Sequence, residues 1–214
     1  MRLIYRILEI IIKSLFIGFL SSAPMGPVGM LCVQRTLNDG RAHGLYTGIG
    51  AVVGDMLLAL IAFIAALGMG LSQDFLHQYQ QPLQIIGSII LIAFGYIIFR
   101  RNPSKNLAKL RENRMSVWKV IVSALILTVT NFGTLFLYMA LFARFHIIDP
   151  EKSFAFDLLS VLVIGIGALL WWLLITYIIT RLRRRFNPRG LQIFNRIVGI
   201  ILIVVGIVGI FTSL

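Results

Sequence analysis

Six long apolar runs constrain the fold of this chain more than any other feature of its sequence. A helix needs about 20 apolar residues to cross a bilayer, and the runs are close to that length or longer. They are predicted at residues 7–37, 45–71, 83–99, 117–145, 154–180 and 191–211. Since hydrocarbon offers no partner to a free backbone N–H or C=O, a spanning segment has to pair its own backbone groups. The sequence therefore predicts an all-α membrane protein, a single transmembrane domain over 1–214 with six transmembrane segments.

The charged residues are few and unevenly placed. They make up 13% of the chain, about half the share found in a soluble domain, and the net charge is +12. Because the cations gather between the apolar runs, they indicate membrane topology, and no nucleic-acid partner is expected. Cys32 is the single cysteine, which excludes a disulfide within the chain, a thiol redox relay and a thiolate metal site.

Positive charge also predicts the orientation. Three stretches hold 15 of the 20 Lys and Arg residues: Arg35 with Arg41, residues 100–119 and residues 181–196. Because such charge stays in the cytoplasm, we expect the loops near residues 38, 110 and 186 to be cytoplasmic and both termini to be outside. The basic residues Arg2 and Arg6 support an alternative, in which the first segment is re-entrant and the N-terminus is inside.

The first apolar run is interrupted by Pro24-Met25-Gly26-Pro27. Each proline removes a backbone donor and clashes with the preceding turn, and glycine lowers helix propensity further. A membrane protein tolerates such a break only where it is buried in protein or lines a wet cavity. The N–H groups that follow Pro27 lack intrahelical partners and favour an anionic group. We therefore expect Pro24, Met25, Gly26 and Pro27 to bind substrate.

A second interruption is predicted by an internal repeat. The tripeptide Leu-Gln-Ile occurs at 83–85 and at 191–193, and at nearly the same offset the first break falls on Thr130 and Asn131. We expect two inverted three-helix repeats, 1–107 and 108–214, with the first and fourth segments interrupted. Paired interruptions indicate a binding site at the midplane. Thr130 and Asn131 would hold a substrate ammonium or carboxylate there, or would only satisfy the backbone. Gln34 and Tyr138 are further substrate-binding candidates.

Asp55 lies about ten residues into the second apolar run. A carboxylate costs roughly 2.5–3.5 kcal/mol at such a position, so it has to face a cavity or a partner. One interpretation is proton coupling, in which Asp55 takes up and releases a proton during transport. The other is structural, a hydrogen bond to the backbone freed at Pro24 or Pro27. Both interpretations place Asp55 beside the break.

The second run also carries a strip of glycines, which lets another helix approach closely. We expect helix packing at Gly40, Gly44, Gly48, Gly50 and Gly54. Trp171 and Trp172 lie inside the fifth run, where an interfacial aromatic belt is the simpler interpretation and a cavity wall the alternative.

Several function classes lack their residues. His43, His77 and His146 are not spaced as metal ligands, and we expect no metal site. Without a Walker motif, nucleotide loop or Ser/His/Asp set, neither a catalytic site nor a cofactor is expected, and the chain is not expected to be an enzyme. A non-transporting membrane scaffold or accessory protein is one alternative, and a metal-ion exporter of similar architecture is another.

The first 55 residues carry a recognisable signature. Ser22-Ala23-Pro24-Met25-Gly26-Pro27, followed by Gly40-Arg41, Gly44, Gly50 and Gly54-Asp55, resembles the lysine exporter (LysE/RhtB) family of amino-acid exporters. The closing Asn195-Arg196-Ile197-Val198-Gly199 is similar to the family's last-helix pattern, whereas Phe132 stands where the family often has proline after Asn131.

This resemblance implies a secondary active exporter of amino acids or related small metabolites. Transport would be driven by the proton-motive force and would proceed by alternating access around the two broken helices. The resemblance further implies a bacterial inner membrane, contact with membrane lipids and a homo-oligomer, for which we expect a homodimer. Its partners would be a small-molecule substrate and protons.

Overall fold

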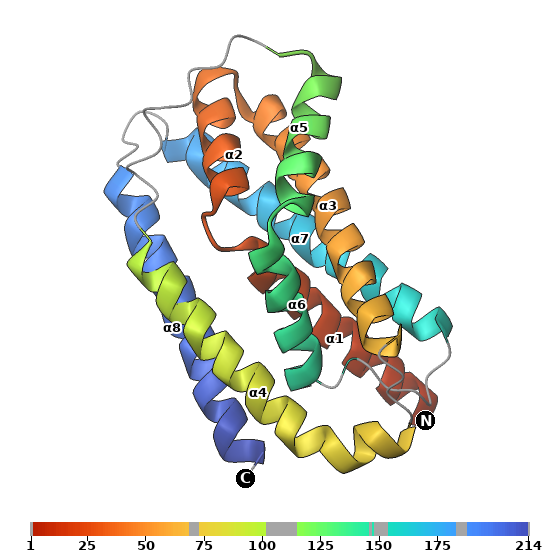
Figure 1. Cartoon of the computed structure of the whole chain (residues 1–214). Coiled ribbons are helices and arrows are strands. Elements are labelled where there is room, and N and C mark those ends of the chain that lie inside the picture. Colours follow the sequence, from red (N-terminus) through yellow and green to blue (C-terminus); the bar gives the residue numbers. More distant parts are fainter. Residues whose placement is uncertain are drawn as a thin grey trace.

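The computed structural model describes residues 2–68, 73–101, 115–145, 147, 154–182 and 188–213. All the regular structure in these ranges is helical (Figure 1). The helices are α1 (Arg2–Ser22), α2 (Pro27–Asn38), α3 (Arg41–Gly68), α4 (Gln73–Arg100), α5 (Val117–Val129), α6 (Phe132–Phe145), α7 (Phe154–Leu182) and α8 (Pro188–Ser213). The loop positions 110 and 186, His146 and the repeat boundary at 107/108 lie outside the described residues.

Four of the helices, α3, α4, α7 and α8, are long and apolar enough to cross a membrane by themselves. The other four form two bent pairs. The pair α1 and α2 bends by 74°, the pair α5 and α6 bends by 63°, and counting each pair as one crossing gives six. The prediction of an all-α membrane protein with interrupted first and fourth segments is confirmed. The chain is therefore a multi-pass membrane protein.

α4 differs most from its predicted extent. α4 begins at Gln73, ten residues before the predicted start at 83, and Pro82 lies inside it. A proline in a helix removes one backbone hydrogen bond and kinks the helix, but helical geometry resumes on both sides. The early part of α4, drawn in yellow, curves beneath the other helices (Figure 1).

The helices pack in an exchanged pattern. Each half of the described chain contains a bent pair followed by two unbroken helices. α1 packs against α7, α5 packs in the same way against α3, and α4 pairs with α8. Both termini lie at one end of the molecule, at the bottom of Figure 1, and the turn between α2 and α3 lies at the other end. This pairing is what two inverted halves would produce.

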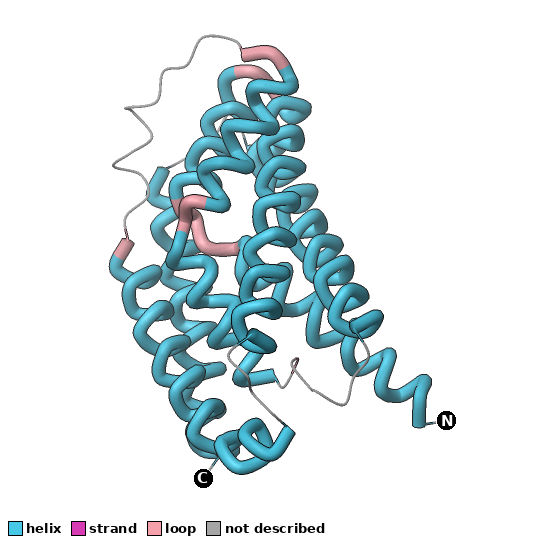
Figure 2. The backbone as a smooth tube through the Cα atoms, turned by 45° about the vertical axis from the view of Figure 1, so that its right-hand side comes forward, coloured by secondary structure: helices cyan, strands magenta, loops and turns pink. Residues whose placement is uncertain are grey.

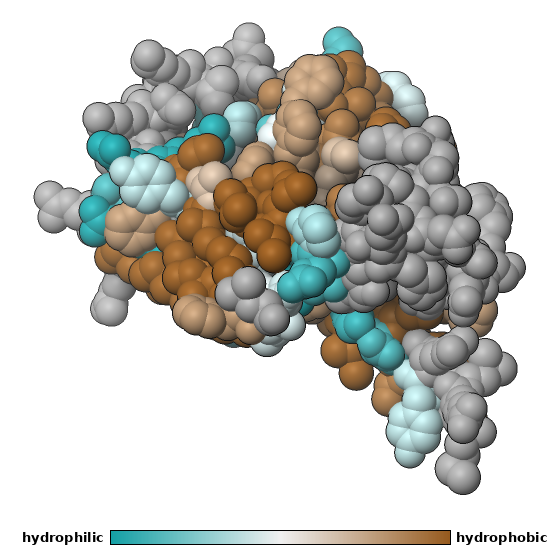
Figure 3. Space-filling view, turned by 60° about the horizontal axis from the view of Figure 1, so that its bottom comes forward, coloured by the Kyte–Doolittle hydropathy of each residue, from teal (hydrophilic) through white to brown (hydrophobic). Residues whose placement is uncertain are grey.

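The outward faces of these helices are apolar. On α3, Ile49, Val53, Leu57 and Ile61 are all more than 40% exposed, and their four-residue spacing places them on one face. α7 and α8 expose similar rows of Leu, Ile and Val. Seen from the end that holds the termini, hydrophobic side chains cover much of the described surface (Figure 3). In a membrane protein such faces contact lipid rather than water.

Glycines allow the helices to approach α3 closely. A Cβ at Gly48 would lie 2.7 Å from the Cβ of Trp172 on α7, and one at Gly54 would lie 2.7 Å from the Cβ of Thr128 on α5. Gly50 and Gly44 face the backbone oxygen of Ile121 and the hydroxyl of Thr36. These four glycines lie at helix contacts, and they set the distances between α3 and its neighbours.

Gly40 does not belong to the predicted strip of packing glycines. It adopts φ +94°, and a Cβ there would meet no described atom within 4 Å. This backbone conformation strains any residue with a side chain. Gly40 therefore forms the turn that reverses the chain between α2 and α3, and it takes no part in helix packing.

Gly50→Ala should lower the free energy of unfolding by about 1–3 kcal/mol, the usual range for overpacking. The added methyl group would meet the backbone of α5, which moves less easily than a side chain. Gly190→Ala is the matched control, because a Cβ at Gly190 would meet no described atom within 4 Å, and it should not lower stability. Unfolding in detergent is the measurement. Equal stability of the two variants would contradict close packing of α3 on α5.

Candidate functional site

The two helix breaks meet in the interior of the molecule. In Figure 2 the loop segments between α1 and α2 and between α5 and α6 lie side by side, and residues of both line one cavity of about 40 Å³. A cavity of this size has room for roughly three water molecules. Its lining residues are Ser21, Ser22, Pro24, Gly26, Pro27, Val28, Gly29, Ala51, Asp55, Thr128, Asn131, Thr134 and Trp172.

The first break leaves backbone donors at the cavity. α1 ends at Ser22, and the Gly26 N–H turns back to donate to the Pro24 carbonyl at 2.7 Å. Pro27 then starts α2 at a position where proline lacks only an N–H that has no helical partner. The first intrahelical bond at this end runs from the Met30 N–H to the Gly26 carbonyl at 3.0 Å. Consequently, the positive end of α2 faces the cavity.

The second break is built differently, because it contains no proline. The Asn131 N–H donates to the Thr128 carbonyl at 3.0 Å, and the Phe132 N–H donates to the Thr130 carbonyl at 3.1 Å. The Thr134 N–H donates to the Asn131 carbonyl at 2.9 Å. This tight turn pairs backbone groups locally, and it presents the Thr128, Asn131 and Thr134 side chains to the cavity.

The structure places Thr130 differently from the prediction that it binds a substrate. Its side chain is exposed, and its hydroxyl donates to the Ile126 carbonyl of its own helix at 2.8 Å. The turn rotates Thr130 away from the cavity, while Thr128 and Asn131, on either side of it, line the cavity. A role of Thr130 in binding a substrate is not supported by this geometry.

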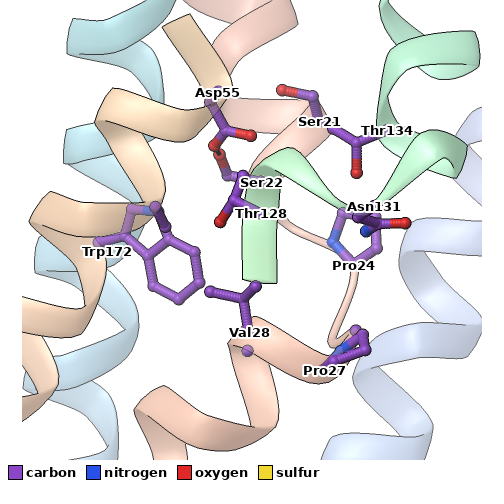
Figure 4. A pocket seen from close by; sticks show the side chains of 13 residues that line it. Ser21, Ser22, Pro24, Pro27, Val28, Asp55, Thr128, Asn131, Thr134 and Trp172 are labelled. Carbon is purple, nitrogen blue, oxygen red and sulfur yellow. Dashed lines mark hydrogen bonds between the residues drawn. The ribbon is translucent and has the colours of Figure 1, made fainter. Parts of the chain in front are cut away.

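Asp55 lies against the first break (Figure 4). Its side chain is 4% exposed, and the Ser22 hydroxyl donates to Oδ2 at 2.8 Å. The adjacent Ser21 hydroxyl lies 2.9 Å from the Tyr138 hydroxyl. The end of α1 thus connects a carboxyl group on α3 with a phenol on α6. Asp55 faces the cavity rather than lipid.

The other predicted binding residues divide into two groups. Pro24, Gly26, Pro27 and Asn131 line the cavity, whereas Met25, Gln34 and Tyr138 are buried outside it. Gln34 lies two turns along α2, and its Oε1 has no hydrogen-bond partner among the described residues. Across the same ranges no three His, Cys, Asp or Glu side chains group as metal ligands would.

Asn195 on α8 is a residue that the sequence interpretation did not assign to the site. It is fully buried, and its Oδ1 accepts the N–H of Met25 inside the break at 2.9 Å. The sequence could have suggested a buried role for this residue, because Asn195 is the single asparagine of the last apolar run. The last helix therefore holds the backbone of the first break.

The two tryptophans of α7 form no exposed belt, because Trp171 and Trp172 are 2% and 3% exposed. Trp171 packs between Phe19 and Phe194, with ring centroids 5.3 and 5.0 Å away. Trp172 lines the cavity, and its indole points into it (Figure 4).

Ser21 and Ser22 also line the cavity, and the sequence interpretation did not assign them to the site. The sequence could have suggested them, because they are adjacent hydroxyl residues directly before the break.

The family model described as LysE type translocator matches residues 19–212. This chain belongs to the LysE type translocator family. The translocator is 21% identical to the "Putative amino acid efflux protein YcgF" of Bacillus subtilis (strain 168), over 93% of this chain and 94% of the relative. It is 23% identical to the "Uncharacterized membrane protein YahN" of Escherichia coli (strain K12), over 79% and 75% of the two chains. No solved structure matches the translocator.

Replacing Asn195 with Leu should destabilise the translocator by about 1–3 kcal/mol, because the Met25 N–H would lose its buried acceptor. Thr130→Val is the control, since the Thr130 hydroxyl bonds only within its own helix and exposed positions change stability little. Thermal unfolding of both variants in detergent measures the difference. An Asn195→Leu variant as stable as the control would show that the break does not depend on α8.

Proposed function

We propose that this translocator is a secondary active exporter of amino acids or related small metabolites, driven by the proton-motive force. The observation that carries the proposal is a buried carboxyl group, Asp55, in a cavity where two broken helices meet. Burying a carboxyl group inside the membrane costs free energy, and membrane proteins retain such groups chiefly along substrate or proton pathways. The name of the Bacillus subtilis relative supports amino acids as the substrate class.

Transport would require the cavity to widen. A space of about 40 Å³ holds a few waters, and an amino acid is larger than that. The inverted halves would rock around the breaks, so that the cavity opens first to one side and then to the other. Pro24, Met25, Gly26, Pro27 and Asn131 would shape the substrate site in this cycle.

In this proposal, two sets of contacts would close the cavity in turn from its two ends. Toward the end with the termini, the Phe142 ring packs at a tilt against the Tyr138 and Phe63 rings, with centroids 5.8 and 4.5 Å away. Toward the other end, Arg35 on α2 donates to the Ser123 hydroxyl at 3.0 Å and to the Thr47 hydroxyl at 3.3 Å. These contacts tie α2 to α3 and α5, and in this proposal they break when the cavity opens.

Asp55 would couple the proton to the substrate. In the proposed cycle it takes a proton from outside and releases it inside as the substrate leaves. A purely structural carboxyl group, held by Ser22, is the competing role. In that case the chain could be a scaffold or accessory protein without transport activity.

The proposed location is the bacterial inner membrane, with the first segment as a broken span and both termini outside. The turn near residue 38 and the loops near 110 and 186 would be cytoplasmic. A homodimer in contact with membrane lipids is the expected assembly, and the exposed apolar faces of α3, α7 and α8 would contact lipid or the second copy.

Asp55→Asn should abolish amino-acid flux driven by a pH gradient in proteoliposomes, because an amide cannot carry the proton. The substitution keeps the size of the side chain and an acceptor for Ser22, so the protein should stay folded. Thr130→Val is the control, since Thr130 faces away from the cavity, and its flux should match the wild type. Undiminished flux in a folded Asp55→Asn protein would remove Asp55 from the coupling mechanism.

A second measurement tests the orientation. Cys32 is the single cysteine and is buried, so a cysteine introduced at the exposed Asn38 can be labelled selectively. A membrane-impermeant maleimide should label Asn38→Cys only after the cells are opened, and a reporter fused to the C-terminus should be active outside. Labelling of intact cells, or a cytoplasmic reporter signal, would reverse the proposed topology.

A further inference from the structure

The cavity has a negative pole and a positive pole. Asp55 is the single ionisable side chain among the described lining residues. Its Oδ2 accepts from Ser22, and no described residue donates to Oδ1. The first turn of α2, at Val28 and Gly29, also lines the cavity, and its N–H groups have no helical acceptor.

A second donor lies beside the α2 N-terminus. Trp172 is 3% exposed, and its indole Nε1 has no hydrogen-bond partner in the described part of the chain. A buried N–H of this kind normally has an acceptor. In Figure 4 the Trp172 indole and Val28 lie on one side of the cavity, and Asp55 with Ser22 lies on another. Once the cavity widens, a carboxylate placed between Trp172 and the first turn of α2 would supply that acceptor.

We propose that the cavity binds an α-amino acid as a zwitterion, with its ammonium group on Asp55 and its carboxylate at the N-terminus of α2 beside Trp172. This proposal rests on the proposed export function and deepens it. The second break supplies Thr128, Asn131 and Thr134, which are neutral and hydrogen-bond either polar group without balancing its charge. Both the free amine and the free carboxylate of the substrate are then required for tight binding.

One consequence is that the substrate and the proton exclude each other. An ammonium group pairs with Asp55 only while the carboxyl group is ionised, so a bound proton weakens substrate binding and a bound substrate expels the proton. A site that holds either one but not both exchanges them across the membrane. Coupling then follows from competition at one carboxyl group and needs no second proton site.

The groups around Asp55 are compatible with this competition. α1 presents Ser21 and Ser22, α5 presents Thr128 and α7 presents Trp172, which carry no charge. Tyr138 of α6 does not contact Asp55 through a hydrogen bond of its own; its hydroxyl lies against the Ser21 hydroxyl, next to Ser22. The cation of α2, Arg35, contacts Thr47, which lies eight residues from Asp55, roughly 12 Å along α3.

Calorimetric titration of the purified full-length protein tests the proposal. The 20 protein amino acids are first screened singly by thermal shift, and the one that stabilises most is titrated in buffers of different ionisation enthalpy over a pH series. Proton release should rise toward about one proton per amino acid at the acid end. The N-acetyl form and the methyl ester of the same amino acid should each bind about tenfold more weakly or worse.

Two variants locate the two poles. Trp172→Phe keeps an aromatic side chain but removes the N–H, and it should weaken binding about tenfold, whereas Asp55→Asn should abolish proton release. Trp171→Phe is the matched control, because its indole is equally buried and unpartnered among the described residues but lies outside the cavity lining. Its affinity should stay within about twofold of the wild type.

The outcomes separate the two proposals. If no amino acid binds and none is exchanged in proteoliposomes, both the export function and the zwitterion site are wrong. Should the wild type exchange amino acids and yet bind the N-acetyl form or the methyl ester equally well, only the zwitterion site is wrong. The analogue titrations use the wild type, so a Trp172→Phe protein that fails to fold would not prevent this decision.

Discussion

Hydrocarbon cannot hydrogen-bond to a peptide group, and the structure of this protein depends on how it meets that constraint at two broken helices. The first break contains two prolines, and one of its freed N–H groups reaches Asn195 on the last helix. The second break turns through Asn131 and pairs its backbone locally. Close packing at Gly50 and Gly54 brings α5, and with it the second break, against α3. The polar interior is thus assembled from segments far apart in the sequence.

The two halves match in helix order but differ in chemistry. The first half contributes the carboxyl group of Asp55, the positive end of α2 and the Ser21 and Ser22 hydroxyls, whereas the second contributes only neutral hydroxyl, amide and indole groups. The difference in free backbone groups follows from proline. Pro27 starts α2 with free N–H groups, whereas α6 starts at Phe132 after a turn that satisfies its own backbone. The cavity between two halves with the same helix order therefore has two sides that are not equivalent.

Much of this architecture could be predicted from the sequence, because its causes are local. Apolar runs define the crossings, Pro24 and Pro27 have to break a helix, and a carboxylate at Asp55 has to face other protein groups. The side chains at the second break were less predictable, because one turn decides that Thr128 faces the cavity and Thr130 does not. Asn195 contacts a residue 170 positions away, and only tertiary packing reveals which backbone group an isolated amide serves.

Gly48 is important because it has no side chain. It does not line the cavity, but the Cβ and Cγ of Trp172 lie 2.7 and 2.8 Å from where a Gly48 side chain would begin. The absence of that side chain is what lets the indole sit back against α3. A larger residue at this position would push the Trp172 indole inward and shrink the cavity. Gly48 therefore sets how far the indole projects into the cavity, although Gly48 itself is not among the lining residues.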